Sequence, residues 1–286
     1  MGHEQRAESV VLCGLPGSGK TSFLAALWHV ITSQEIASDL KFDSLPENSE
    51  YLVELEREWV SASPIVHTPA GRIYPASINL LGKSGKVVLE CPDLSGELWM
   101  HAWEDRRVSK EVEDRCNRAA GILFFVHADE YEKGLRISEM LAMARDLGES
   151  LPAETSVTQE WQASKCPTQT ILVDLLQSLS THPLGKRGVR VAIILSAWDL
   201  ALDTQKQPLE YLSDAMPLLG QYLRTNQGGA LNWRVFGVSA LGGDVATKKG
   251  QLLSHARPYQ RIIVSDNAMQ SNDITKPISW LLEHCT

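Results

Sequence analysis

The stretch GLPGSGKT, Gly14 to Thr21, decides the fold. It matches the pattern GxxxxGK[ST], follows the apolar run SVVLC at 9–13, and precedes apolar residues at helical spacing. A strand, a glycine-rich turn and a helix in this order predict a phosphate-binding loop. Glycines let backbone N–H groups turn inward, and a helix N-terminus favours an anion. The alternative is a tight turn with a solvated lysine, and the agreement of the motif with both flanks argues against it.

Each residue type in this loop has a place along a phosphate chain. The Lys20 ammonium would reach the β- and γ-phosphates, and the Thr21 hydroxyl would coordinate Mg²⁺. Backbone N–H groups from Gly17 onward would point at the phosphates. The residues expected to bind are Gly14, Pro16, Gly17, Ser18, Gly19, Lys20, Thr21 and Ser22.

The pattern of apolar runs predicts an α/β fold. Near-continuous runs, which suit strands covered on both faces, lie at 10–13, 86–91, 121–126, 189–195 and 233–238. The run at 72–81 alternates in part and contains Pro75, so we expect an edge strand that GKSG turns into the next strand. Helices are expected at 21–32, 136–148, 168–179, 208–223 and 273–285, the last capped by Asp273. Together these predict a three-layer P-loop NTPase fold, with a mostly parallel six-stranded sheet and one antiparallel edge strand.

The length of 286 residues suits one large domain or two small ones. We expect a single domain over 1–286. Three stretches at 36–71, 149–167 and 240–272 show the composition of loops or insertions.

Composition narrows the class of protein. A net charge of −8 argues against a nucleic-acid binder, which needs clustered lysine and arginine. No apolar run approaches the roughly 20 residues of a membrane span, and the first residues lack an apolar signal core. The five cysteines are odd in number and form no CxxC, which predicts reduced thiols in a cytoplasmic protein.

Three later motifs each follow an apolar run. KVVLECPD leads to Asp93, and Asp93 to Gly96 read DxxG; LSAWD lies at 195–199 and VSAL at 238–241. With these motifs in this order, the chain resembles the Ras-like (TRAFAC-class) P-loop GTPases. GLPGSGKTSFLAALWHVIT and ITKPISWLL further resemble the bacterial double-GTPase branch of that class.

The resemblance implies roles at matching positions. Asp93 would hold a Mg²⁺-bound water, and Gly96 would donate its N–H to the γ-phosphate. Asp199 would accept from the guanine N1–H and amine, while Ser239 and the N–H of Ala240 would lie at the guanine O6. Simpler explanations compete, since an aspartate after a strand often caps a helix and Ser-Ala is a common dipeptide.

The resemblance also implies a Mg²⁺-binding threonine before the edge strand, where Thr68 lies, although Thr68 could be an ordinary loop residue. The expected metal ligands are therefore Thr21, Thr68 and Asp93. The expected catalytic residues are Lys20, Gly96 and Glu97.

Two departures from the family pattern matter. Ala197 replaces the lysine that covers the base, and Trp198 either supplies apolar cover or packs elsewhere. Glu97 stands where the family places glutamine, so it either acts as a base or leaves turnover slow, because a carboxylate repels the γ-phosphate.

The segment 94–107 is the expected contact for a protein effector. LWMHAW at 98–103 gathers apolar side chains that could be exposed by a nucleotide-dependent change, or could pack on the sheet in both states. Arg106 and Arg107 could act on the phosphates or be solvated. His127 and the segment DEYEK at 129–133 read as a strand end and a solvated loop.

The sequence thus predicts a Mg²⁺-dependent switch that binds GTP and GDP and hydrolyses GTP slowly, with a homodimer and a hetero-complex as its candidate assemblies. The alternatives are a P-loop ATPase and a nucleotide-locked scaffold without turnover.

Overall fold

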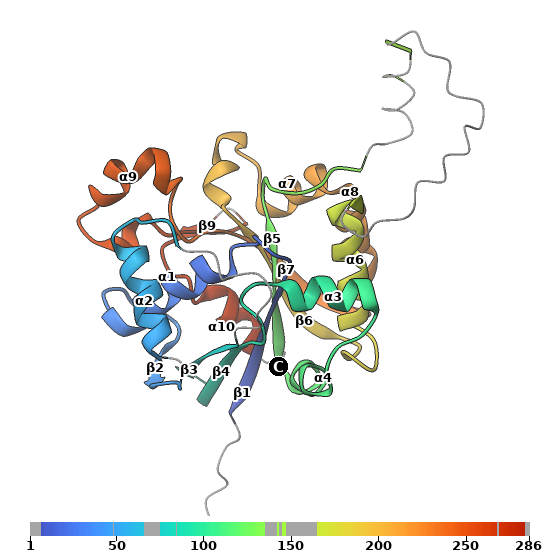
Figure 1. Cartoon of the computed structure of the whole chain (residues 1–286), viewed down its shortest axis with the longest axis horizontal. Helices are drawn as coiled ribbons and strands as arrows, with labels where there is room; N and C mark the ends of the chain where they lie inside the picture. Colours follow the sequence, from blue (N-terminus) through green and yellow to red (C-terminus); the bar gives the residue numbers. More distant parts are fainter. Residues whose placement is uncertain are drawn as a thin grey trace, which may run out of the picture.

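The computed structural model describes residues 7–47, 49–65, 75–83, 85–134, 142, 145–146, 165–267 and 269–283. Its centre is a twisted sheet in the order β2-β3-β4-β1-β5-β6-β7-β8-β9 (Figure 1). The strands are β1 (Glu8–Gly14), β2 (Lys41–Ser44), β3 (Ala76–Gly82), β4 (Gly85–Cys91), β5 (Gly121–His127), β6 (Val189–Ser196), β7 (Leu231–Ser239), β8 (Ile263–Asp266) and β9 (Met269–Ser271).

Helices cover both faces of the sheet. They are α1 (Lys20–Ser33), α2 (Ser49–Val60), α3 (Glu97–Asp105), α4 (Lys110–Arg118), α6 (Thr168–Leu179), α7 (Pro208–Ala215), α8 (Pro217–Asn226), α9 (Val245–Leu253) and α10 (Lys276–Leu282). The described residues also form the short 3₁₀ turns η2 (Trp198–Leu200), η3 (Leu202–Thr204) and η4 (Pro258–Arg261).

The sheet is mixed, and the predicted count of six strands is wrong. β4, β1, β5, β6 and β7 run parallel, as expected, and β3 pairs antiparallel with β4 through Gly82 and Gly85. The structure adds β2 beyond β3 and β8 and β9 beyond β7, so β3 is not an edge strand. The added strands have only four, four and three residues, too short to show an apolar period in the sequence.

Most expected helices are confirmed, with shifted ends. The helix expected at 208–223 is two helices, because Pro217 cannot continue α7 and begins α8 instead. The closing helix begins at Lys276, and Asp273 holds the turn before it by accepting from the N–H of Thr275 at 2.9 Å. The helix expected at 136–148 falls mostly outside the described residues.

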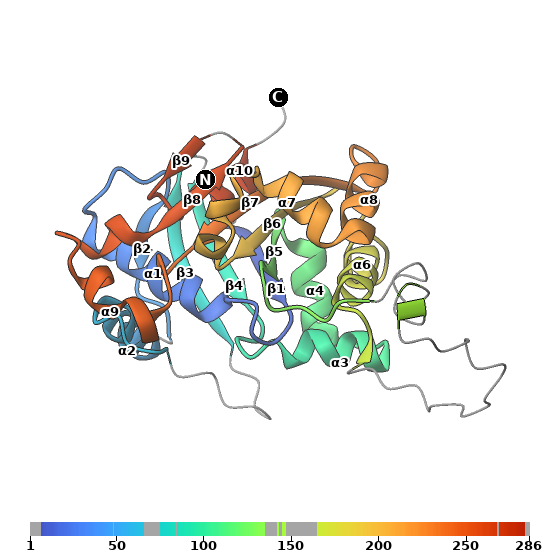
Figure 2. The same cartoon turned by 90° about the horizontal axis from the view of Figure 1, so that it is seen from above.

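Two apolar cores lie on the two faces of the sheet. In Figures 1 and 2, α1, α2 and α9 lie on one side of the sheet and α3, α4, α6 and α8 on the other. The first core includes Phe23, Leu27 and Ile278, and the second includes Trp99 and Leu176, all essentially inaccessible to solvent. Burial of such side chains from both faces explains why the central strands read as continuous apolar runs.

The stretches predicted as loops at 36–71 and 240–272 contain regular elements. The first holds β2 and α2, and the second holds α9, η4, β8 and β9. Helix α2 packs on α1, where Glu56 lies 2.8 Å from Nδ1 of His29. The stretch 149–167 lies mostly outside the described residues.

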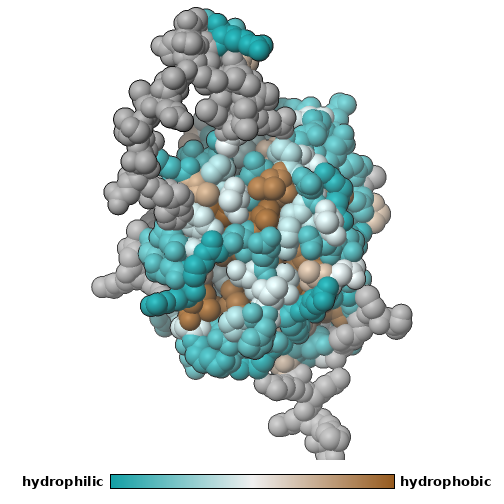
Figure 3. Space-filling view, turned by 90° about the vertical axis from the view of Figure 1, so that its right-hand side faces the viewer, coloured by the Kyte–Doolittle hydropathy of each residue, from teal (hydrophilic) through white to brown (hydrophobic). Residues whose placement is uncertain are grey.

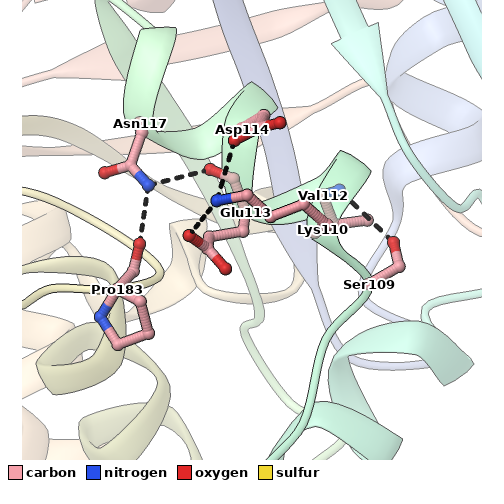
Figure 4. A network of polar contacts seen from close by, with 7 residues as sticks. All are labelled: Ser109, Lys110, Val112, Glu113, Asp114, Asn117 and Pro183. Carbon is pink, nitrogen blue, oxygen red and sulfur yellow. Dashed lines mark hydrogen bonds and ion pairs between the residues drawn. The ribbon is translucent and has the colours of Figure 1, made fainter.

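Polar contacts attach α4 to the loop before β6 (Figure 4). Ser109 caps the helix by accepting from the N–H of Val112 at 3.3 Å, and Lys110 pairs with acidic side chains one turn on. Asn117 donates to the carbonyl of Pro183 at 2.6 Å. The exposed ion pairs contribute little to stability, whereas Val112 and Cys116 of this helix are buried in the core. No helix in the described ranges is long and apolar enough to cross a membrane.

The packing of β7 against η2 predicts a stability effect. A Cβ at Gly237 would lie 2.3 Å from the Trp198 ring, so Gly237→Ala should overpack the core and lower the free energy of unfolding by about 1–3 kcal/mol. Gly250→Ala is the matched control, since nothing lies within 4 Å of its Cβ and alanine favours helix α9. Urea unfolding of both variants tests this; equal midpoints would contradict it.

Candidate functional site

A cavity of about 750 Å³ opens at the carboxyl ends of the parallel strands, where an α/β sheet binds its ligands. Its volume falls in the range of small-molecule sites. The predicted site residues that line it are Pro16, Gly17, Ser18, Gly19, Lys20, Thr21, Ser22, Glu97, Asp199, Ser239 and Ala240. Segments far apart in the sequence therefore meet in one place.

The phosphate loop takes its shape from glycines in the left-handed region. Gly17 and Gly19 have φ of 72° and 86°, a conformation that residues with a Cβ rarely adopt. Gly19 also lies against β6, because a Cβ there would be 2.8 Å from that of Ser196. Gly14 lies below the loop, where a Cβ would meet the Ser18 hydroxyl at 2.6 Å.

Lys20 is a buried cation at the first position of α1. Its Nζ donates to the carbonyl oxygens of Gly14 and Leu15, both at 2.9 Å, and to Oγ of Ser18 at 3.3 Å. Burial lowers the pKa of Lys20, and the nearby groups of Cys91, Cys13 and Asp93 oppose that shift. An ammonium group makes stronger hydrogen bonds to an anion than to neutral carbonyl oxygens. The Lys20 ammonium is therefore suited to bind a phosphate.

Gly96 brings the DxxG segment against the phosphate loop. Its φ is 86°, and it caps the N-terminus of α3. A Cβ at Gly96 would lie 2.6 Å from the carbonyl carbon of Leu15 and 2.7 Å from Nζ of Lys20. Both the backbone conformation and the space therefore require glycine here.

Asp93 lies behind the cavity wall rather than in it. The side chain is fully buried, and its oxygens accept from the hydroxyl of Ser95 at 2.7 and 2.8 Å and from the N–H of Leu98 at 3.0 Å. Asp93 thus organises the start of α3, with Ser95 between it and the cavity.

The oxygen ligands predicted for a metal are in different places. Thr21 lines the cavity, Asp93 is one layer behind, and Thr68 lies outside the described residues. In the part of the chain that the structure describes, no three His, Cys, Asp or Glu side chains gather to hold a metal. Mg²⁺ commonly takes few protein ligands and completes its shell with water and phosphate oxygens, so Thr21 with Asp93 behind it fits that ion.

Asp199 and Ser239 meet at the other end of the cavity. Asp199 lies in η2, directly after β6, and its carboxylate accepts a short hydrogen bond from the Ser239 hydroxyl. Oγ of Ser239 in turn accepts from the N–H of Gly242 at 3.0 Å. These bonds hold the loop after β7 against η2, with Ala240 on the cavity wall.

Trp198 packs elsewhere, the second of the two options that the sequence left open. Its ring lies over Gly237 and edge-on to Tyr211, and Nε1 donates to Oγ of Ser265 at 3.0 Å. Apolar contact at this end of the cavity comes instead from Leu200 and Leu241. The sequence assigns no role to either leucine, although Leu200 directly follows the LSAWD motif and Leu241 is the last residue of VSAL.

His127, the last residue of β5, and Glu130 in the loop after it also border the cavity. Nδ1 of His127 accepts from the N–H groups of Asp129 at 3.2 Å and Glu130 at 2.8 Å. Glu130 is exposed, as expected of a solvated loop, yet its carboxylate lies 3.9 Å from where a Cβ of Gly17 would be. The sequence predicts a strand end and a solvated loop for these two residues and not a place in the site. Their position at the carboxyl end of a parallel strand is the sequence feature that could have indicated the cavity.

The charges on the cavity wall are mostly negative. Among the described lining residues, Lys20 is the cation, and the carboxylates are those of Glu97, Glu130, Asp199 and Asp244. A polyphosphate bound here would need a further positive charge, which a divalent cation can supply.

The apolar residues of segment 94–107 pack on the protein. Trp99 and Trp103 are buried in the core beside α4 and α6, while Leu98 and Met100 are partly exposed. Arg106 pairs with Asp174 of α6 rather than facing the phosphate loop. Figure 3 shows this side of the molecule, which is largely hydrophilic with separate apolar patches.

The contact at Gly96 can be tested by substitution. Gly96→Ala should weaken binding of inorganic tripolyphosphate by at least about tenfold, because the new Cβ would push the phosphate loop or Lys20 aside. Gly188→Ala is the matched control: it also has a positive φ, of 75°, but its Cβ meets nothing within 4 Å. Titration calorimetry measures both, and equal affinities in the two variants would refute the contact.

Comparison with known proteins adds a family. No curated protein matches the chain. Among solved structures, the GTPase-like domain of S. cerevisiae Ski7 bound to GTP is 11% identical with a TM-score of 0.43, over 83% of this chain and 43% of that one. The small GTPase Arl6 BBS3 from Trypanosoma brucei is 14% identical with a TM-score of 0.37, over 87% and 95%. The family model Double-GTPase 1 matches residues 11–281, and the chain therefore belongs to this family of P-loop GTPases.

Proposed function

We propose that the protein is a Mg²⁺-dependent switch that binds GTP and GDP, hydrolyses GTP slowly and acts on a protein partner. The observation that carries this is the convergence of the phosphate loop, the DxxG segment, Asp199 and Ala240 around one cavity. Membership of a GTPase family supports GTP binding.

Recognition of guanine rests on Asp199 and Ala240. A carboxylate accepts from the N1–H and exocyclic amine of guanine, whereas adenine presents an acceptor at N1. The hydroxyl of Ser239 supports this assignment, since its hydrogen bond orients the Asp199 carboxylate. The N–H of Ala240 would then face O6 of the same base.

Mg²⁺ would be held by the Thr21 hydroxyl, through water by Asp93, and by Thr68 as the sequence predicts. The ion supplies positive charge that neutralises the β- and γ-phosphates. Lys20 would contribute a second positive charge, from the protein itself. Its ammonium donates to carbonyl oxygens of the phosphate loop and would therefore lie beside bound phosphates.

Slow turnover follows from the position of Glu97. Its side chain lines the cavity, and its N–H donates to Oγ of Ser95 at 3.2 Å, at the start of α3. A carboxylate there opposes the negative charge of a γ-phosphate. A basic group from a partner or a second copy of the chain would offset it.

The contact with a partner is proposed for segment 94–107. Gly96 lies at the phosphate loop and begins α3, so a change at the γ-phosphate would reach that helix directly. Nε1 of Trp99 is buried without a hydrogen-bond partner among the described residues, which costs about 1–3 kcal/mol and favours a second position for α3.

A cytoplasmic setting is proposed because Cys13, Cys91 and Cys116 are free and buried.

An ATPase and a locked scaffold are the alternatives. Equal affinity for ATP and GTP would favour the first, and nucleotide retained without phosphate release would favour the second.

Base selection can be tested by changing Asp199. Asp199→Asn should weaken GTP and GDP binding by roughly 10- to 100-fold, because a charged acceptor is lost, and should improve binding of xanthosine triphosphate, whose 2-carbonyl can accept from the new amide. ATP binding should not change. Competition binding with Mg²⁺ measures this, with Lys20→Ala as the variant expected to bind no nucleotide. A wild-type protein indifferent to the base would exclude the guanine assignment.

The role of Glu97 can be separated from binding. Glu97→Gln removes the negative charge and should raise the single-turnover rate of GTP hydrolysis by about threefold or more, with affinity changed less than threefold. Glu130→Gln is the control. It also removes a carboxylate from the wall of this cavity, but Glu130 follows β5 and does not belong to α3. A fall in rate would instead identify Glu97 as a general base, and a large loss of affinity would identify a structural role.

A further inference from the structure

Helix α2 contacts the loop that follows β7. Trp59, near the end of α2, is fully buried, and its Nε1 donates to the carbonyl oxygen of Ala240 at 2.8 Å. These residues lie 181 positions apart in the chain. The hydrogen bond fixes the carbonyl of the peptide between Ala240 and Leu241, which adjoins the peptide that carries the Ala240 N–H, and Ala240 lies on the wall of the cavity.

Arg261 holds Trp59 from the other side. The guanidinium lies 4.0 Å from the centre of the Trp59 ring and donates to the Trp59 carbonyl. Burial lowers the pKa of Arg261 to about 10, which still leaves it charged at neutral pH. The backbone of Arg261 also contacts the same loop, because a Cβ at Gly242 would lie 2.4 Å from its carbonyl oxygen.

His29 connects Trp59 to the phosphate side of the cavity. The His29 and Trp59 rings lie 5.0 Å apart, and Glu56 holds Nδ1 of His29 at 2.8 Å. His29 belongs to α1, the helix that begins at Lys20. Figure 1 shows α1, α2 and α9 grouped on one side of the sheet.

We propose that Trp59 is a positioning residue for base selection, which acts by holding Ala240 in place through its indole N–H. This rests on the proposed function, in which the N–H of Ala240 faces the guanine O6. Without the indole donor, the buried carbonyl of Ala240 loses its partner, and the loop from Ser239 to Gly242 can turn to recover one. The phosphate loop shares no hydrogen bond with Trp59, so its contacts would stay.

The test compares two tryptophan variants with three ligands. Trp59→Phe keeps an aromatic ring beside Arg261 and His29 but removes the N–H. The control is Trp233→Phe, because Nε1 of Trp233 also donates to a backbone carbonyl, that of Leu223 at 2.6 Å, and Trp233 does not line the cavity. The ligands are GTP, ATP and inorganic tripolyphosphate, each with Mg²⁺, measured by calorimetry on the full chain.

We expect Trp59→Phe to weaken GTP binding by about five- to tenfold while ATP and tripolyphosphate bind as before. Trp233→Phe should leave all three unchanged. An unchanged ratio of GTP to ATP affinity in Trp59→Phe would overturn the proposal, as would an equal loss for all three ligands, which marks a general structural role. A wild-type chain without guanine preference would instead overturn the proposed function itself.

A second variant covers the case in which Trp59→Phe does not fold. Arg261→Lys keeps the charge but loses the flat guanidinium that stacks on the Trp59 ring. It should lower the ratio of GTP to ATP affinity in the same direction, and a folded Arg261→Lys with the wild-type ratio would overturn the proposal.

Discussion

The structure depends on a positive charge placed inside the protein, where β1 turns into α1. A buried ammonium is costly unless polar partners surround it, and Nζ of Lys20 takes them from the carbonyls of Gly14 and Leu15. Between these carbonyls and Lys20 the loop passes through two left-handed glycines, Gly17 and Gly19. Gly96 then approaches so closely that a single methyl group would displace the loop or the lysine. The space around the Lys20 ammonium and its loop thus requires glycine at position 96, which is distant in the sequence.

Strand order, rather than the Lys20 charge, arranges the opposite end of the cavity. Parallel strands bring their carboxyl ends to one edge, so the segments after β5, β6 and β7 come to lie beside the phosphate loop. The Ser239 hydroxyl ties two of these segments together by bonding Asp199 across neighbouring strand ends. The cavity is therefore built by strand order, and side chains at the strand ends line it.

The elements outside the minimal fold are arranged around that cavity. β2 and α2 extend one side of the molecule, and α9, η4, β8 and β9 extend the other end of the sheet. They meet where Arg261 stacks on Trp59 and Trp59 bonds Ala240. The described wall of this cavity carries one lysine and several carboxylates, so a bound polyphosphate would need positive charge beyond that of Lys20.

The sequence by itself determined the parallel core, the helix after the phosphate loop and the motif residues at the strand ends. Long apolar runs and glycine patterns are local features of the sequence, and each strand of the parallel core has such an apolar run. Tertiary structure alone decided what had no local signal. The short strands β2, β8 and β9 form only by pairing with neighbours already in place, and His127 and Glu130 join the cavity wall through strand order. Trp198 turns into the core and Trp59 toward Ala240 because of partners far along the chain, Ser265 and Arg261, which no spacing within a single segment can reveal.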